Sequence, residues 1–215
     1  MIGLEAAWIS LGRQLRKPEG LGGHFLALTM SLANERSNSV AIAALDIARN
    51  DTILELGFGG GDAIRVIANA AAEAQVFGID HSAAMCLRAS RRLRSTIHDG
   101  RVLLVQGNLK RLPWQECAVD KCLAVHVAYF MSAREVHEAR RVLRIGGRLV
   151  VLVTDKAAMR RWKFAFPETH RQFAESDLTR LLLDGGFSRQ EMCLQRVSLG
   201  MGIPGLLALA TKLTR

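Results

Sequence analysis

The pattern of apolar and polar positions changes at Asp51, where short apolar runs begin to alternate with helix-length amphipathic segments. The runs predict strands at residues 52–56, 74–79, 102–105, 121–127 and 148–153. The segments between them predict helices at residues 62–72, 82–96 and 133–143. Strands that are apolar almost throughout, joined by helical crossovers, are typical of a parallel sheet covered on both faces. We therefore expect a doubly wound α/β fold with right-handed crossovers.

The N-terminal part of the chain predicts helices rather than strands. Residues 2–15 and 24–48 have helical patterns, separated by a break at residues 18–23, and the second is interrupted near residues 34–38. We expect residues 1–50 to form a helical cap, or lid, in the same domain as the binding region at residues 51–215. Four side chains either line the substrate side of this lid or belong to the helix core: Trp8, Gln14, Phe25 and Met30.

The C-terminal part predicts one more helix and two more strands. Ser176 can cap a helix at residues 177–183, which Gly185 and Gly186 end. Residues 187–197 predict a strand, and residues 206–211 predict a last one after a short link rich in glycine. So short a link suits an antiparallel pair. The sheet is therefore expected to have seven strands, mostly parallel, with an antiparallel C-terminal pair.

Length and composition fit one domain, because single cores stop growing only at about 250 to 300 residues and this chain has 215. Its 29 lysines and arginines against 20 acidic residues give a net charge of +9. That excess favours nucleic acid, an anionic membrane surface or an acidic substrate as a partner. The arginines are spread along the chain, however, and those on predicted helices, including residues 88–94 and 140–148, are interpreted as solvated faces.

Cysteine use and hydropathy indicate a reduced, cytoplasmic protein. The four cysteines form no CxxC pair and no metal-ligand spacing, so no metal site is expected. The first residues lack the pattern of a signal peptide. The apolar stretch at residues 199–210 is shorter than the roughly 20 residues that span a bilayer. Neither membrane insertion nor an oligomeric state follows from the sequence.

The strongest chemical signal is a glycine-rich turn between a buried strand and a helix, at residues 53–63. Glycines allow a sharp turn and close approach of a ligand to the backbone, and the helix N-terminus offers unpaired N–H groups. The spacing is GxGxG, through Gly57, Gly59 and Gly61. A dinucleotide fingerprint would need glycine or alanine where Asp62 stands, so a nicotinamide cofactor is disfavoured.

Glu55-x-Gly57-x-Gly59-x-Gly61 resembles the first motif of class I S-adenosylmethionine-dependent methyltransferases, and four later segments agree. Asp80 with Ser82 and Met85 is similar to the family's D-x-S-x-x-M pattern, and Asn108-Leu109 to its adenine motif. Leu112-Pro113 resembles its L-P pair, and residues 138–149 its E-x-x-R-V-L-x-P-G-G-x-L segment, with Ile145 in place of proline. The resemblance implies S-adenosylmethionine as cofactor. It places cofactor contacts at Glu55, Gly57, Gly59, Gly61, Asp80, His81, Met85, Asn108, Leu109 and His126.

The family implies transfer of a methyl group from a sulfonium to a nucleophile, and the end of the fourth strand should face that group. Three subclasses are disfavoured there. Base methyltransferases need an Asn/Asp-Pro-Pro-aromatic sequence and cysteine-dependent RNA enzymes need a Pro-Cys pair, and both are absent. Metal-dependent catechol enzymes need a carboxylate where His126 stands. The remaining branch acts on small molecules and resembles ubiquinone and menaquinone methyltransferases.

His126 is the candidate general base, since an imidazole can take a proton from a hydroxyl or amine. The alternative is that it only contacts the cofactor or packs beneath it. Tyr129 either orients substrate or walls the pocket with Phe130. The remaining histidines named here are expected on the surface: His24, His137 and His170.

Residues 156–163 follow the fifth strand, where Arg160, Arg161 and Trp162 either recognise an acidic or aromatic substrate or form a solvated basic helix. Three other functions stay open. The +9 charge favours an RNA or protein substrate, although aromatic residues are only 6% and do not cluster into a stacking platform. The fold can also bind S-adenosylmethionine without catalysis. The third is the disfavoured dinucleotide oxidoreductase.

Overall fold

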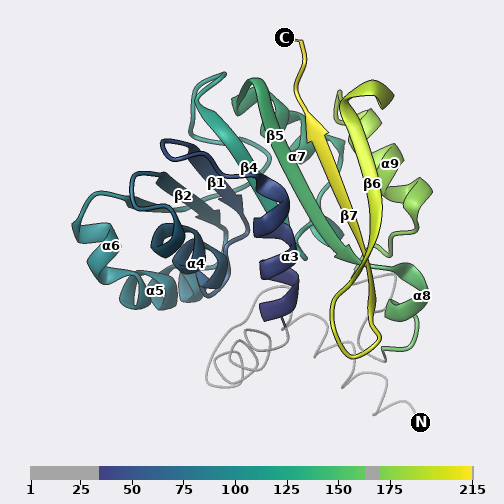
Figure 1. Ribbon diagram of the computed structural model, residues 1–215, viewed down its shortest axis with the longest axis horizontal. Helices are drawn as coiled ribbons and strands as arrows, with labels where there is room; N and C mark the ends of the chain where they lie inside the picture. The colour runs from purple at the N-terminus through teal and green to yellow at the C-terminus, as the bar shows by residue number, and fades with distance from the viewer. Residues whose placement is uncertain (1–33, 163–169, 215) are drawn as a thin grey trace.

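The computed structural model describes residues 34–162 and 170–214. In this part of the chain, a seven-stranded sheet has the order β3-β2-β1-β4-β5-β7-β6 (Figure 1). The strands are β1 Thr52–Leu56, β2 Gln75–Asp80, β3 Val102–Gln106, β4 Val119–Val125, β5 Leu143–Thr154, β6 Met192–Ser198 and β7 Pro204–Thr211. The strands from β1 to β5 pair in parallel. Strand β7 runs antiparallel to both β5 and β6, which confirms the predicted architecture.

Helices cover both faces of the sheet. In the described part of the chain they are α3 Glu35–Leu45, α4 Asp62–Ala70, α5 Ala83–Arg92, α6 Arg94–His98, α7 Ala133–Val142, α8 Lys156–Met159 and α9 Glu175–Asp184, with the short 3-10 helices η1 Ala128–Phe130 and η2 Arg189–Glu191. Buried residues of α3, α4 and α5 share one core cluster, on one face. Those of α7 and α9 share the other. None of these helices is long and apolar enough to cross a membrane.

Strand β5 shows why the predicted strands are apolar throughout. In β5, Val151 and Val153 belong to the cluster under α7 and α9, whereas Val150 and Leu152 belong to the cluster under α3 and α4. All four are at most 1% exposed. Successive side chains of a strand point to opposite faces, so a strand that is dry on both faces has no polar alternation.

The N-terminal segment is described only from residue 34. Helix α3 runs without a break through the residues where an interruption was expected. Its Ala41 and Leu45 are fully buried against the sheet, and the helix lies across β4 and β5 (Figure 1). Within the described part, the expected cap is therefore a layer of the domain.

Several boundaries differ from the prediction, and three of the differences have a local reason. The helix predicted at residues 82–96 is divided at Leu93, whose φ of −101° and ψ of 16° are not helical, into α5 and α6. Strand β6 begins at Met192 rather than at residue 187, because η2 precedes it. Helix α9 begins at Glu175, where the Asp177 carboxylate accepts the Ala174 N–H at 2.9 Å. Ser176 therefore lies inside that helix and does not cap it.

Strand β5 begins five residues earlier than predicted, with an irregular register opposite β4. Val119 pairs with Leu143 and Lys121 with Arg148. The extra residues of β5 contain Gly146, which has a φ of +82°. A Cβ on the neighbouring Gly147 would lie 2.8 and 2.9 Å from two carbonyl oxygens. The two glycines of the E-x-x-R-V-L-x-P-G-G segment therefore allow the strand to make this irregular turn.

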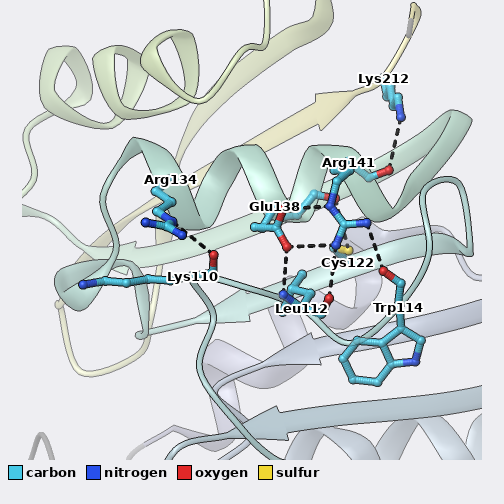
Figure 2. A network of polar contacts seen from close by, with 9 residues as sticks. Lys110, Leu112, Trp114, Cys122, Arg134, Glu138, Arg141 and Lys212 are labelled. Atoms are coloured by element: carbon cyan, nitrogen blue, oxygen red, sulfur yellow. Dashed lines mark hydrogen bonds and ion pairs between the residues drawn. The ribbon is translucent and has the colours of Figure 1, made fainter.

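Lys212 follows β7 and is a buried lysine, 1% exposed. Its ammonium donates to the carbonyl oxygen of Leu143 at 2.8 Å and to that of Arg141 at 3.4 Å. These carbonyls stand at the C-terminal end of α7 (Figure 2), where helices leave acceptors unpaired and carry partial negative charge. The end of the chain is thus attached to α7.

Replacing Lys212 with Met should lower the free energy of unfolding by about 2 kcal/mol, because hydrogen bonds from a charged donor to buried carbonyls are lost. Urea unfolding followed by circular dichroism measures this. The matched control is Lys156→Met, whose half-exposed ammonium lies 3.9 Å from Asp177. Such a surface pair is worth roughly 0 to 1 kcal/mol. Equal losses in the two variants would contradict the role given to Lys212.

Candidate cofactor and active site

The predicted site residues follow the carboxyl ends of neighbouring strands. Gly57 follows β1, Asp80 ends β2, Asn108 lies two residues past β3 and His126 follows β4. Strand β1 pairs with both β2 and β4, so the chain order reverses at its carboxyl end (Figure 1). Open parallel sheets bind ligands in the crevice at such a switch point. The fold therefore brings the four segments to one edge of the sheet.

The three glycines of the loop all have positive φ, between +51° and +76°. Their surroundings differ. A Cβ on Gly57 would lie 2.5 Å from Val127 Cγ2, and one on Gly61 about 3 Å from Leu93 and Ala89. A Cβ on Gly59 would meet nothing within 4 Å. Gly57 and Gly61 therefore allow close packing, whereas Gly59 leaves its backbone open to a ligand.

Asp62 begins α4 and forms an ion pair with Arg92 at 2.6 Å. Its charge is therefore balanced within the protein. The prediction that disfavours a nicotinamide cofactor rests on the residue type at position 62, which is neither glycine nor alanine, so this ion pair leaves it unchanged.

The Asp80 carboxylate connects the glycine loop to helix α5. One oxygen accepts the Gly59 N–H at 2.9 Å and the other accepts the Ser82 N–H at 2.8 Å. Ser82 in turn caps α5, with its hydroxyl oxygen accepting the Met85 N–H at 3.4 Å. An ionised carboxylate can accept about four hydrogen bonds. Asp80 is thus held in place and still has acceptor capacity for two ribose hydroxyls.

The residues expected around adenine lie at the ends of β2 and β3. Met85 is buried at 5% exposure, whereas His81 and Asn108 are exposed. His81 Nδ1 lies 3.6 Å from Asp80 Oδ1. The Asn108 side-chain oxygen accepts the Lys110 N–H at 3.0 Å, and Leu109 packs on the edge of the core. A flat ligand that reaches Asp80 therefore has both an apolar wall and an amide beside it.

Glu55 is the fourth of the five residues of β1 and is 4% exposed. One of its oxygens, Oε2, has no hydrogen-bond partner among the described residues. Burial, followed by the nearby Asp80 charge, raises the pKa of Glu55 to about 8, although the Ile64 N–H opposes this. Buried polar atoms in proteins nearly always have partners. A carboxyl group in this situation fits a cationic ligand group, such as the ammonium group of S-adenosylmethionine.

Replacing Glu55 with Gln should flatten the dependence of stability on pH. A pKa raised above its unfolded value keeps the proton on the native carboxyl while the unfolded one ionises, so stability falls as pH rises from about 4.5 to 8. Urea unfolding at pH 6.5, 7.25 and 8 should show this fall in the wild type and not in the variant. Glu116→Gln, at an exposed position, is the control. A fall of equal size in Glu55→Gln would contradict the assignment.

His126 has contacts at both ring nitrogens. Nδ1 lies 3.0 Å from the Tyr129 hydroxyl, and Nε2 lies 2.9 Å from the Ser37 hydroxyl. The Thr154 N–H donates to the same Tyr129 oxygen at 2.7 Å. His126 also has a φ of +56°, which is uncommon for a residue other than glycine. Its backbone N–H is bonded to the Leu152 carbonyl at 2.8 Å.

The direction of this hydrogen-bond chain follows from its fixed donor. Because the Thr154 N–H can only donate, the Tyr129 O–H is left to donate to His126 Nδ1, and His126 Nε2–H then donates to Ser37. This assigns the tautomer from the network. Desolvation lowers the pKa of His126 to about 4, so the ring is neutral near pH 7. Ser37, 1% exposed, has no place in the sequence prediction, because its partner lies 89 residues away.

Nitrogen-15 NMR of the His126 ring should show a neutral Nε2–H tautomer that does not titrate between pH 5.5 and 8. Tyr129→Phe removes the donor to Nδ1, so the Nε2–H tautomer should lose population. The ring should stay neutral, because the burial that lowers the pKa of His126 to about 4 remains. The exposed His137 serves as an internal reference. If Tyr129→Phe left the His126 tautomer unchanged, the proposed direction of the hydrogen-bond chain would be wrong.

Aromatic rings gather next to His126. The Tyr129 ring lies 6.1 Å from that of His170 and 6.3 Å from that of Phe173, and Phe130 lies 5.1 Å from His170. The prediction of a surface position for His170 was wrong, since it is 6% exposed. Packing by segments distant in the sequence, which no local pattern reveals, buries it. His137 is exposed as predicted.

The basic segment after β5 divides into two kinds of side chain. Arg160 and Arg161 are exposed, and Trp162 packs against the core.

Some predicted positions lie outside the described residues: the lid residues Trp8, Gln14, Phe25 and Met30, and also His24. Among the described residues, no three histidine, cysteine or acidic side chains are grouped so as to hold a metal ion.

Known proteins match the region that contains this site. A family model for a methyltransferase domain matches residues 54–151. The uncharacterized methyltransferase YdaC of Bacillus subtilis is 28% identical over 131 residues, which are 60% of this chain and 70% of that protein. A ubiquinone/menaquinone biosynthesis C-methyltransferase of Syntrophotalea carbinolica is 34% identical over 55% of this chain and 50% of its own length. The chain thus spans about half the length of this second relative.

Solved structures share the fold. The [4+2]-cyclase SpnF has a TM-score of 0.69 and 20% identity, covering 83% of this chain and 82% of its own. A geranyl diphosphate C-methyltransferase of Streptomyces coelicolor A3(2) has a TM-score of 0.66 and 17% identity, covering 82% and 75%. The family match begins within β1 and ends within β5, so it includes every strand end that carries the site. Residues 54–151 are thus similar to the methyltransferase domain family, whose matched relatives include S-adenosylmethionine-dependent methyltransferases.

Proposed function

We propose that the chain transfers a methyl group from S-adenosylmethionine to a nucleophile on a small molecule. The observation that carries the proposal is the Asp80 carboxylate, fixed by the Gly59 and Ser82 N–H groups at the switch point of the sheet. When bound, the cofactor supplies a sulfonium-activated methyl group for in-line displacement. Little acid–base chemistry is then required of the protein, and positioning alone can supply about 7 to 11 kcal/mol of a barrier.

Each site residue has a proposed task in holding the cofactor. Asp80 accepts hydrogen bonds from the ribose hydroxyls, and Glu55 faces the ammonium group. Gly57, Gly59 and Gly61 let the backbone approach the ligand. His81, Met85, Asn108 and Leu109 enclose adenine.

His126 and Tyr129 border the position of the methyl group. We propose that their main contribution is to hold the pocket wall in place. In the assigned tautomer Nε2 carries the proton and Nδ1 accepts from Tyr129, so His126 can act as a general base only if this tautomer or this contact changes when substrate binds.

Two observations support a small-molecule substrate. Aromatic rings line the described wall beside His126, and the relatives include proteins named for acting on quinones and geranyl diphosphate. The +9 charge favours an RNA or protein substrate instead. Several arginines, however, are paired inside the fold, including Arg92 with Asp62, Arg141 with Glu138 and Arg144 with Asp120.

The four free cysteines agree with a reducing, cytoplasmic location.

Replacing Asp80 with Asn should remove cofactor binding. At 100 times its dissociation constant, S-adenosylhomocysteine should stabilise the wild type by about 2.7 kcal/mol, and raise the midpoint of thermal unfolding by roughly 5 to 10 °C. The variant should show no such rise, whereas the control Asp99→Asn, at an exposed position, should keep it. NAD should shift none of the three. A normal shift in Asp80→Asn would refute the site assignment.

The substrate class is tested by following labelled methyl groups from S-adenosylmethionine. Quinols, isoprenyl diphosphates, bulk RNA and a protein mixture are offered in parallel, with Asp80→Asn as the blank. Label in a small-molecule fraction supports the proposal. Label in RNA or protein alone would favour the second candidate, and binding without label in any fraction would indicate a non-catalytic protein.

A further inference from the structure

The segment that carries Asn108 and Leu109 has no helix or strand of its own, although it joins β3 to β4. Within the described part of the chain, two hydrogen bonds between backbone groups hold residues 107–114 in place: Gly107 N–H to the Asp80 carbonyl at 2.9 Å and Arg111 N–H to the Asn108 carbonyl at 3.2 Å. An irregular loop cannot place an amide beside a ligand unless other groups hold it. The remaining support comes from helix α7.

Side chains of α7 hold this loop at alternate residues (Figure 2). Arg134 Nε donates to the Lys110 carbonyl at 3.2 Å. Glu138 Oε2 accepts the Leu112 N–H at 2.8 Å. The Arg141 guanidinium donates to the Leu112 and Trp114 carbonyls at 3.1 and 3.0 Å. Residues 134, 138 and 141 follow the i, i+4, i+7 spacing of one helix face. Side chains of this helix face thus form the hydrogen bonds with the loop backbone that a neighbouring strand would otherwise provide.

Glu138 and Arg141 are also bonded to each other through two contacts, of 2.7 and 2.8 Å. Their hydrogen bond lowers the pKa of Glu138 and raises that of Arg141, so both are charged. Their side chains are 13% and 29% exposed. The interpretation of Arg141 as part of a solvated helix face was therefore wrong. Its charge serves an internal contact, and the fork of the guanidinium reaches two carbonyls and a carboxylate together.

The far end of the loop is connected to the ribose side of the site. The Trp114 ring stacks on that of Phe77 in β2, with centroids 5.7 Å apart and planes at 18°. Three residues beyond Phe77, β2 ends at Asp80. The arginine that holds the Trp114 carbonyl therefore also stabilises the packing of the strand that carries Asp80.

We propose that Glu138 and Arg141 are positioning residues for cofactor binding, which act through the loop at residues 108–114 and do not contact the cofactor. They fix the backbone of Leu112 and Trp114, and so set the place of Asn108 and Leu109. The inference rests on the proposed assignment of Asn108 and Leu109 to adenine. It also gives one physical reason for two separate sequence patterns, since Leu112-Pro113 and Glu138-x-x-Arg141 contact each other.

The test measures the affinity for S-adenosylhomocysteine by calorimetry and amide hydrogen exchange by mass spectrometry on the full chain. Arg141→Ala should raise the dissociation constant at least tenfold and accelerate exchange in residues 108–114 more than in the core strands. Arg144→Ala is the matched control, because it removes an arginine that pairs with Asp120 near the same helix end. This control should bind within about twofold of the wild type.

Conservative variants separate positioning from loss of folding. Glu138→Gln keeps an oxygen for the Leu112 N–H and should recover most of the affinity that Glu138→Ala loses. Arg141→Lys keeps the charge without the fork, so its affinity should lie between those of the wild type and Arg141→Ala. Faster exchange throughout the core of every variant, with no preference for the loop, would overturn the proposal and leave the pair a general stability role.

Asn108→Ala, measured in parallel, separates failure of this inference from failure of the site. If Asn108→Ala weakens binding and Arg141→Ala does not, the positioning role is wrong while the adenine assignment stands. If neither weakens binding although Asp80→Asn does, the adenine assignment fails and the inference fails with it.

Discussion

The carboxylate of Asp80 connects the turn after β1, which lies 21 residues away in the sequence, to the end of β2 and the start of α5. Its two oxygens take N–H groups from Gly59 and Ser82. A carboxylate without these donors would be nearly buried, at 7% exposure, with little to offset its desolvation. With them it is held at the reversal point of the sheet, with acceptor capacity left for a ligand. The glycine loop, the helix start and the proposed ribose site therefore depend on one side chain.

Buried polar groups near the site fall into two kinds. One kind forms a continuous chain of hydrogen bonds, which runs from the Thr154 N–H through Tyr129 and His126 to Ser37. That chain holds His126 at a positive φ that would otherwise be unfavourable. Glu55 instead keeps an unpaired oxygen. A satisfied network rigidifies a pocket wall, whereas an unpaired buried carboxyl group marks the place where a ligand completes the structure. The distinction supports a wall at the end of β4 and a binding position above β1.

Local signals were enough to predict most of the fold and to propose the first group of site residues. The dry strands β4 and β5, the three glycines and Asp80 each carry a pattern within about ten residues, because burial on both faces and positive φ restrict residue type directly. Contacts between distant segments could not be predicted in this way. Ser37 and His126 are 89 residues apart, and Leu112 and Glu138 are 26 apart. The burial of His170 and the internal pairing of Arg141 depend on the same kind of contact, and single-sequence periodicity gives no information about either.

The net charge illustrates why composition alone is a weak guide to substrate. An excess of +9 is a property of the chain, but a polyanion responds only to charge at the surface. In the described residues, the Arg141 guanidinium forms hydrogen bonds with Glu138 and two carbonyl oxygens. The buried Lys212 ammonium donates to a carbonyl at the end of α7. Arg92 balances the acidic residue that begins α4. Each such contact removes a positive group from the set available to RNA. Among the exposed basic residues of the described part, Arg160 and Arg161 follow β5, at the same edge of the sheet as the proposed site. There they would attract a small anionic substrate, such as a diphosphate, as readily as they would attract a nucleic acid.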